Sequence, residues 1–204
     1  MSRWPGAAAR LAGRRAVLEP LADEHAGELY LAARDPRIWE LMEIDASASP
    51  RAFATWFGHA MGASRAGEEV PFAVRDRWSG SVVGSTSYLA LAPEHRRLEV
   101  GSTWYAPDVW GTGLNAECKL LLLGHAFERL GCVRVELKTD ARNERSRAAM
   151  LAFGATFEGV FRKHMQRRYG VRDTAWYSVI DDEWPAVRAR LEERARSIGR
   201  GASP

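Results

Sequence analysis

The sequence predicts an α/β protein of the α+β kind, built on a mixed and mostly antiparallel sheet that is flanked by helices. Three strand-like runs follow one another between residues 72 and 105 with turn residues between them, as in an antiparallel meander. A long apolar helical pattern over residues 114–130 then separates two strand-like runs, and such a strand–helix–strand unit requires a parallel pair. We therefore expect one central parallel strand pair inside an otherwise antiparallel sheet.

The remaining elements follow from hydrophobic spacing and from capping residues. Residues 133–138 alternate apolar and charged side chains, as a half-buried strand does. Asn143 is an N-cap for the helix that follows, and Gly154 ends that helix. The expected helices cover about residues 23–33, 50–63, 114–130, 143–153 and 182–197, and the expected strands about residues 16–21, 72–74, 82–91, 98–105, 133–138, 156–165 and 172–180.

Length and composition bound the domain organisation. The chain has 204 residues, of which 46% are hydrophobic and 27% charged, so collagen-like, low-complexity and wholly disordered classes are excluded. This length suits a single domain with a real hydrophobic core. We expect that domain over residues 14–197, with flexible tails at residues 1–13 and 198–204.

The sequence also favours a particular compartment. The two cysteines cannot form a disulfide framework, and no apolar run approaches the length of a membrane span. Arg14-Arg15 resembles the start of an export signal, but Glu19 follows after only three apolar residues, so the apolar core of such a signal is missing. We expect a cytoplasmic protein with no membrane partner.

The charge balance limits the partners. The 29 lysines and arginines nearly match the 26 acidic residues, and the two signs are interspersed along the chain. This pattern is typical of solvated surfaces and argues against nucleic acid as the main partner. The net charge of +3 suits an anionic small ligand. A homodimer formed through the sheet edge is compatible with the expected architecture.

The join at residues 104–114 is the segment that carries chemistry. Trp104-Tyr105 leads through Trp110-Gly111-Thr112-Gly113 into the helix that starts at Leu114. A helix start leaves N–H groups unpaired and carries a partial positive charge, so this join can bind a pyrophosphate that the glycines let approach. Taken alone, the motif fits an ordinary tight turn equally well. Neither the P-loop motif nor the dinucleotide fingerprint is present.

Two segments of the chain together resemble a known family. The first holds Leu98-Glu99-Val100-Gly101-Ser102-Thr103-Trp104-Tyr105 and Trp110-Gly111-Thr112-Gly113-Leu114-Asn115-Ala116-Glu117; the second holds Asn143-Glu144-Arg145-Ser146 followed by Phe153-Gly154-Ala155. They resemble the acetyl-CoA-binding core of the GNAT N-acetyltransferases, and more narrowly the branch of the ribosomal-protein alanine N-acetyltransferases. The resemblance covers roughly residues 14–182, and the expected order of elements agrees with the GNAT fold, in which the central parallel strands splay apart.

The resemblance implies direct transfer of an acetyl group from acetyl-CoA to a primary amine, either a protein N-terminus or a small-molecule amine. Backbone groups near Trp104 would bind the pantetheine arm, and one N–H there would polarise the thioester carbonyl. Asn143 would contact the pantetheine or simply cap its helix. The implied cofactor-binding residues are Trp104, Tyr105, Trp110, Gly111, Thr112, Gly113, Asn115, Ala116, Asn143 and Ser146.

Three positions depart from the family pattern. Trp110 stands where the family has Arg or Gln, and Asn115 stands where it has Gly or Ala. Because backbone N–H groups do most of the phosphate binding, we expect the site to survive both changes. Met150 takes the place of a tyrosine that protonates the leaving thiolate in many relatives, and Ser146 is the nearest substitute. The alternative function is therefore a catalytically silent acetyl-CoA-binding module that acts as a sensor or scaffold.

The reaction needs a base, because a protonated amine has no lone pair. Glu99 is the candidate, directly or through water, although a solvated strand residue fits it equally well. Ser146 is the candidate acid, or it merely belongs to the first turn of its helix. His164 is more typical of a structural residue, and the other histidines lack ligand spacing, so no metal is expected. Three tryptophans either line the acceptor pocket or belong to the core: Trp39, Trp56 and Trp104.

Overall fold

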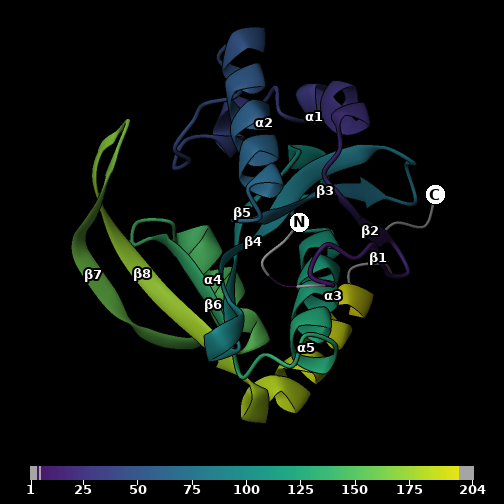
Figure 1. The fold of residues 1–204 in the computed structure, drawn as a ribbon, viewed down its shortest axis with the longest axis vertical. Coiled ribbons are helices and arrows are strands. Elements are labelled where there is room, and N and C mark those ends of the chain that lie inside the picture. Colours follow the sequence, from purple (N-terminus) through teal and green to yellow (C-terminus); the bar gives the residue numbers. More distant parts are fainter. Residues whose placement is uncertain (1–3, 5, 198–204) are drawn as a thin grey trace.

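The computed structural model describes Trp4 and residues 6–197. Within these residues one eight-stranded sheet runs in the order β1-β2-β3-β4-β5-β6-β8-β7 (Figure 1). The strands are β1 (Leu11–Ala12), β2 (Ala16–Pro20), β3 (Val70–Asp76), β4 (Val82–Ala92), β5 (Arg97–Tyr105), β6 (Arg134–Asp140), β7 (Thr156–Arg167) and β8 (Gly170–Ile180). The α-helices are α1 (Ala26–Ala32), α2 (Pro50–Arg65), α3 (Leu114–Glu128), α4 (Glu144–Phe153) and α5 (Trp184–Ser197).

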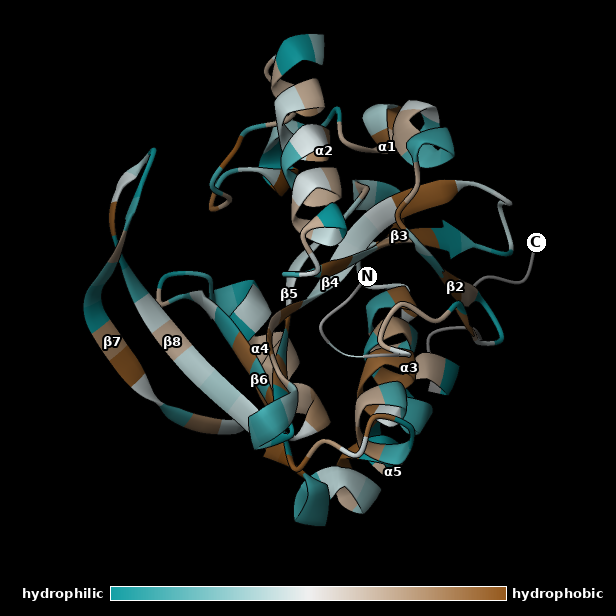
Figure 2. Cartoon of the chain, viewed as in Figure 1, coloured by the Kyte–Doolittle hydropathy of each residue, from teal (hydrophilic) through white to brown (hydrophobic). Residues whose placement is uncertain are grey.

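Helices cover both faces of this sheet. The larger core lies between the sheet and α3, α4 and α5, and a smaller one lies between the sheet and α1 and α2. Successive residues of a strand point to opposite faces, so Phe72 and Val74 of β3 join the larger core while Ala73 joins the smaller. In Figure 2 the hydrophobic colour lies on inner strands and on α3, and the outer strand β7 also carries hydrophobic segments. The central strands are therefore covered on both sides.

The expected mixed sheet with one splayed parallel pair is confirmed. Every neighbouring pair of strands is antiparallel except β5 and β6. The parallel register joins only residues 97–99 to residues 134–136. Beyond Glu99, β5 continues to Tyr105 and β6 to Asp140, and no further residue pair joins them in the part of the chain that the structure describes. The two strands thus open toward the start of α3.

The N-terminal tail expected over residues 1–13 is wrong for the part that the structure describes. Leu11–Ala12 forms β1 and pairs with Val17 and Leu18 of β2. Ala7 is fully buried, and Trp4 is buried in the larger core. These few apolar side chains find a place against the finished domain, which no local periodicity could indicate. Residues 1–3, 5 and the expected C-terminal tail at 198–204 lie outside the described residues.

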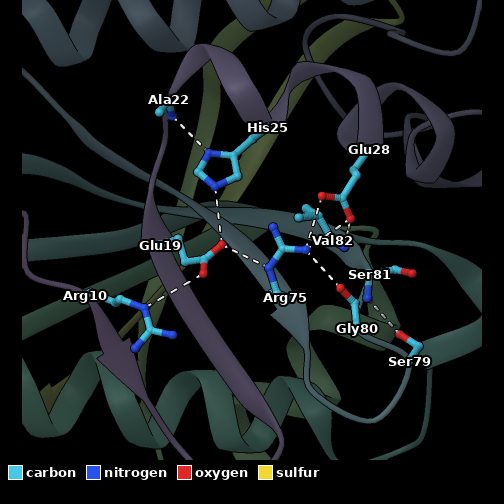
Figure 3. Close-up of polar contacts among 10 residues, drawn as sticks. All are labelled: Arg10, Glu19, Ala22, His25, Glu28, Arg75, Ser79, Gly80, Ser81 and Val82. Atoms are coloured by element: carbon cyan, nitrogen blue, oxygen red, sulfur yellow. Dashed lines mark hydrogen bonds and ion pairs between the residues drawn. The ribbon is translucent and has the colours of Figure 1, made fainter.

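A polar network fastens α1 to the edge of the sheet (Figure 3). Glu28 of α1 accepts hydrogen bonds from Val82 N at 2.9 Å and from Arg75 Nη1 at 3.1 Å. The Val82 N–H, followed by Arg75, holds the pKa of Glu28 below its usual value despite partial burial. Arg75 Nε also donates to Glu19 Oε2, which lies 3.3 Å from His25 Nε2. The network holds α1 against the same face of the sheet that α2 covers.

Candidate active site

The join between β5 and α3 is a tight glycine-containing turn. β5 ends at Tyr105, a short 3-10 turn follows at Pro107–Val109, and α3 begins after Gly113. Gly111 and Gly113 have φ angles of 73° and 81°, a left-handed conformation that glycine adopts without steric cost. Two such residues so close together turn the chain sharply into the helix.

Helix α3 begins without a side-chain cap. Its N-cap residue is Gly113, and the hydrogen bond from Glu117 N to Gly113 O measures 3.1 Å. The geometry of a helix start leaves the N–H groups of Leu114, Asn115 and Ala116 without an intrahelical partner. Together with the helix dipole they form a position suited to an anion. The pyrophosphate expected there remains a prediction.

Buried charges hold this helix start in place. Arg15 Nη2 pairs with Asp76 Oδ2 at 2.7 Å, and Arg15 Nη1 donates to Thr112 O at 3.2 Å. The backbone N–H of Arg15 donates to Glu117 Oε1 at 3.0 Å. A Cβ at Gly13 would collide with the Glu117 carboxylate, so glycine lets the chain lie against α3. The loop that presents the free N–H groups is therefore rigidly supported.

Trp110 organises positive charge beside the loop. Its indole Nε1 donates to Tyr105 O at 2.9 Å, which fixes the ring. Arg145 of α4 lies over the ring, with its Cζ 4.0 Å from the ring centroid, and Arg37 approaches it at 5.5 Å. The indole that replaces the family's Arg or Gln thus gathers two guanidinium groups by cation–π contact. Sequence reasoning missed Arg37, because only tertiary packing brings it here.

β5 carries a bulge just before this join. Two of its residues, Ser102 and Thr103, oppose the single residue Thr86 of β4, and Ser102 has a φ of 47°. A bulge re-aims side chains and interrupts pairing, a feature often found next to functional sites. The side chain of Trp104 that follows belongs to the smaller core, so a contact with the cofactor would have to come from its backbone. That contact remains a prediction, as does that of Tyr105, whose side chain lies in the larger core.

The start of α4 is closed by its own cap. Asn143 Oδ1 accepts a hydrogen bond from Ser146 N at 3.0 Å, so Asn143 is a helix cap. Its contact with pantetheine and the acid role of Ser146 remain predictions. Met150, where the resemblance places a tyrosine, is buried in the larger core. A thioether has no proton to donate, so this position offers no acid.

Glu99 is buried and paired. It is 2% exposed, and its Oε2 lies 2.7 Å from Lys138 Nζ of β6. Its neighbours Leu98 and Val100 face the larger core, so Glu99 faces the α2 side of the sheet. Burial raises the pKa of Glu99, and Lys138 opposes this rise. The alternative of a solvated strand residue is wrong, whereas the role of Glu99 as a base remains a prediction.

A cavity of about 250 Å³ opens on that same face of the sheet. Trp39 and Trp56 line it, and Trp104 packs behind them with its ring 5.0 and 5.3 Å from theirs. Of the three expected tryptophans, two therefore line a cavity and the third supports them. The other lining residues are Met42, Glu43, Ile44, His59, Ala60, Ala63, Glu69, Ser85, Ser87 and Ser102.

The tip of the β7–β8 hairpin meets the loop that walls this cavity. Arg168 donates to Met42 O at 3.3 Å, and Tyr169 OH donates to Leu41 O at 3.2 Å. Arg167 forms an ion pair with Glu43. Sequence reasoning identified the hairpin but not this contact, because the two segments are far apart in the chain. The cavity is therefore bordered by elements that have no local sequence relation.

The remaining reactive side chains have structural surroundings. His164 lies 3.0 Å from Thr174 Oγ1 and packs against Phe161 and Trp176, and its pKa is lowered chiefly by burial. Both cysteines are buried, which raises their pKa values to about 12. Among the described residues no group of His, Cys, Asp and Glu side chains could hold a metal ion. No helix in the described part is long and apolar enough to cross a membrane.

The geometry defines a class of protein: an α+β fold with an anion position at one helix start and a separate cavity across the same strand. The model of the family described as "Acetyltransferase (GNAT) domain" matches residues 15–156. The chain therefore belongs to the GNAT acetyltransferase family.

Known relatives agree with this family. "Uncharacterized N-acetyltransferase YoaA" of Bacillus subtilis (strain 168) is 29% identical over 54% of this chain and 62% of its own length. YdaF of the same organism, named as a candidate ribosomal N-acetyltransferase, is 32% identical over 52% of this chain and 58% of its own length. The chain thus spans about three fifths of the length of these curated relatives.

Solved structures share the whole fold. A GCN5-related N-acetyltransferase from Brucella melitensis is 31% identical, with a TM-score of 0.86 over 93% of this chain and 86% of that one. Mycobacterium smegmatis RimJ, in complex with CoA-disulfide, is 19% identical and has a TM-score of 0.77 over 93% of this chain and 96% of that one. At such low identity the second likeness concerns the fold alone.

Proposed function

We propose that this protein transfers the acetyl group of acetyl-CoA directly to a primary amine. The observation that carries the proposal is the uncapped start of α3, which lies where β5 and β6 open away from each other. A phosphate-bearing ligand held at this helix start has a path along the unpaired edge of β5. The cavity on the other side of β5 supplies room for an acceptor.

The residues present at the opening suit acetyl-CoA. Gly113 carries no Cβ that would hold a phosphate away from the N–H groups of Asn115 and Ala116, and Arg145 adds positive charge nearby. Trp110, Gly111 and Thr112 shape the same loop. Bound acetyl-CoA supplies an activated thioester, and backbone N–H groups near Trp104 would stabilise the developing negative charge on its carbonyl oxygen.

The chain's own acid–base groups decide how the amine is activated. A carboxylate on the α2 face must take a proton from the acceptor, since only the free amine has a lone pair. Met150 cannot protonate the leaving thiolate, but a thiolate leaves readily without protonation. Ser146, partly exposed at the start of α4, is the side chain available to assist the thiolate.

The acceptor is a protein N-terminus or a small amine. The name of the YdaF relative favours a ribosomal protein N-terminus. The modest cavity volume of about 250 Å³ admits either the first residue of a peptide or a whole small amine.

A sensor that binds acetyl-CoA without turnover is the second candidate. Two observations favour it: Met150 cannot act as an acid, and Lys138 already occupies the carboxylate of Glu99. Such a module would retain the α3 start and lose only the chemistry.

An acceptor screen separates the two functions. We expect the purified protein to release CoA thiol from acetyl-CoA only when an amine is present, tested with N-terminal peptides and small amines, and to give an acetylated product by mass spectrometry. Tight acetyl-CoA binding without product from any amine would contradict transfer and support the sensor. A Gly113→Ala variant serves as the control for cofactor dependence.

A further inference from the structure

Glu69 is a carboxylate without a partner in the wall of the cavity. It lies between α2 and β3, and it lines the cavity together with His59 and Ala63 of α2. Its backbone N–H bonds to Ala63 O at 3.4 Å, which keeps the turn against the helix. Its carboxylate forms no hydrogen bond or ion pair with any residue that the structure describes. A half-buried carboxylate in this condition needs a cation or a donor from elsewhere.

Glu99, by contrast, is already satisfied. Lys138 neutralises it at 2.7 Å, it is 2% exposed, and it is not among the residues that line the cavity. An amine that enters the cavity therefore meets Glu69 first. Glu99 stays behind it, paired with Lys138.

The charges around Glu69 favour a cation. Burial raises the pKa of Glu69 first of all, Glu99 and Glu68 raise it further, and Lys138 lowers it. Two other titratable groups line the cavity: His59 of α2, and Glu43, which is paired with Arg167. Lys138 is bound to Glu99, and Arg172 also acts on Glu99, whereas no described cation forms an ion pair with Glu69. An ammonium group beside Glu69 would relieve its unpaired charge.

The opposite wall favours an apolar stem and excludes a carboxylate. Trp39, Trp56, Met42 and Ile44 offer aromatic and aliphatic surface. None of the described residues that line the cavity is a lysine or an arginine. The bordering arginines are engaged, because Arg167 is paired with Glu43 and Arg168 donates to backbone carbonyls of the wall. A negative group on the acceptor would therefore find no free cationic partner in the lining, whereas a hydrocarbon stem would be covered.

We propose that the cavity binds primary amines on an apolar, uncharged stem, and that the Glu69 carboxylate receives the ammonium group. The binding part stands on the cavity alone; the transfer part rests on the proposed function. In transfer, the ammonium gives one proton to Glu69, and the freed nitrogen attacks the thioester carbonyl carbon. As the C–N bond forms and the C–S bond breaks, the sulfur takes the electron pair and the second N–H proton. Glu69 then releases its proton to solvent.

Binding is tested first, without any turnover. Trp39 and Trp56 line the cavity, so intrinsic tryptophan fluorescence reports its occupation. We expect phenethylamine and a peptide with N-terminal phenylalanine to change the fluorescence, and free phenylalanine, which adds a carboxylate, to bind at least tenfold more weakly. The first two probes distinguish a small amine from a chain N-terminus. Equal binding of phenethylamine and phenylalanine would overturn the proposed specificity.

The role of Glu69 is tested with a matched pair of variants. Glu69→Gln should weaken phenethylamine binding by roughly tenfold or more, since a hydrogen bond to a charged group is lost. Glu68→Gln removes the same charge from the exposed neighbouring position and should leave binding within twofold. Unchanged affinity in folded Glu69→Gln would overturn the proposal.

The pH profile distinguishes a proton acceptor from a structural residue. At pH 7 we expect Glu69→Gln to lower kcat/KM for the amine by about a hundredfold, the usual range for a lost general base. The deficit should shrink as pH rises toward the pKa of the amine, because the free amine no longer needs a base. A constant deficit across pH, or a larger loss in Glu99→Gln with normal Glu69→Gln activity, would assign the proton to another group.

The binding and transfer proposals can fail separately. Glu69-dependent phenethylamine binding without acetylation of any amine would retain the site and reject the proposed transfer. Acetylation by the wild type that Glu69→Gln leaves intact would retain the transfer and reject Glu69.

Discussion

Helices α3 and α4 both follow a strand of the splayed pair, yet they begin in opposite ways. α3 starts at Gly113, which has no side chain to cap it, whereas the Asn143 side chain closes the first turn of α4 at 3.0 Å. α3 also buries a charge: Lys119 is 6% exposed, and its Nζ donates to Thr103 Oγ1 at 2.9 Å without an ion-pair partner among the described residues. The buried side chains of α4, by contrast, are Met150 and Phe153.

From this difference we infer that α4 is built for stability and α3 for a ligand. An open start and an unpaired buried ammonium both destabilise an isolated domain. Both occur on α3, where an anion is expected, and both add positive charge to this helix. Departures from the rules of stability therefore coincide with the proposed site, as is common in enzymes. Three substitutions test this contrast.

Replacing Lys119 should give the largest effect, and it should stabilise. Burial lowers the pKa of Lys119 from 10.5 to about 8, and a change of this size corresponds to roughly 3 kcal/mol. Because the folded protein holds the proton less tightly than the unfolded chain, this penalty is present in full below pH 8 and fades as pH rises toward 10.5. Lys119→Met should therefore raise the free energy of unfolding by about 2–3 kcal/mol at pH 7, with a smaller gain at pH 10.

Urea denaturation at the two pH values measures this effect. The exposed Lys163 provides the control, since Lys163→Met removes the same charge from solvent and should change stability by less than about 0.5 kcal/mol. A destabilised Lys119→Met variant would mean that the ammonium is paired more strongly than the structure indicates.

Gly113 keeps the start of α3 accessible to a ligand, because it has no side chain. Gly113→Ala adds a Cβ in the left-handed region and beside the free N–H groups, so acetyl-CoA affinity should fall by about tenfold, or about 1.4 kcal/mol. Isothermal titration calorimetry measures it. Gly131→Ala is the matched control, because Gly131 has a φ of 67° and lies beyond the opposite end of α3. Equal acetyl-CoA affinity in all three proteins would remove the anion position from the mechanism.

The cap of α4 should give the smallest effect. Asn143→Ala removes the bond to Ser146 N and should cost about 1 kcal/mol of stability, measured by thermal unfolding. Asn143→Asp keeps an acceptor oxygen and should retain most of that stability. If acetyl-CoA affinity also drops in both variants, Asn143 contacts the cofactor in addition to capping. Both helix starts would then serve the ligand, and the contrast between them would be lost.

The parts of the site that were predictable are local in sequence. The glycines of the α3 start and the cap of α4 are read from neighbouring residues, because backbone conformation and capping are decided within one turn. The position of Lys138 beside Glu99 was also predictable. Glu136 is the parallel partner of Glu99, and Lys138, two residues later in β6, lies on the same face of the sheet. Sequence reasoning identified both strands but did not draw this consequence.

The parts that were missed depend on packing between distant segments. Glu69 enters the cavity only because the turn after α2 is folded back onto the sheet, and Arg37 reaches Trp110 only across the α1 layer. β1 has two residues and so shows no periodicity at all. Such features become visible only when the sheet is assembled.

The buried cysteines have a practical consequence for kinetics. Cys118 lies inside α3 and Cys132 just beyond its end, and both thiols have pKa values raised to about 12 by burial. A disulfide reagent reacts with thiolates, so the folded protein should contribute almost no background when released CoA is titrated. The same two thiols also report local unfolding, because the rate at which they are labelled measures how often the end of α3 separates from the sheet. A ligand bound at the start of α3 should slow that rate.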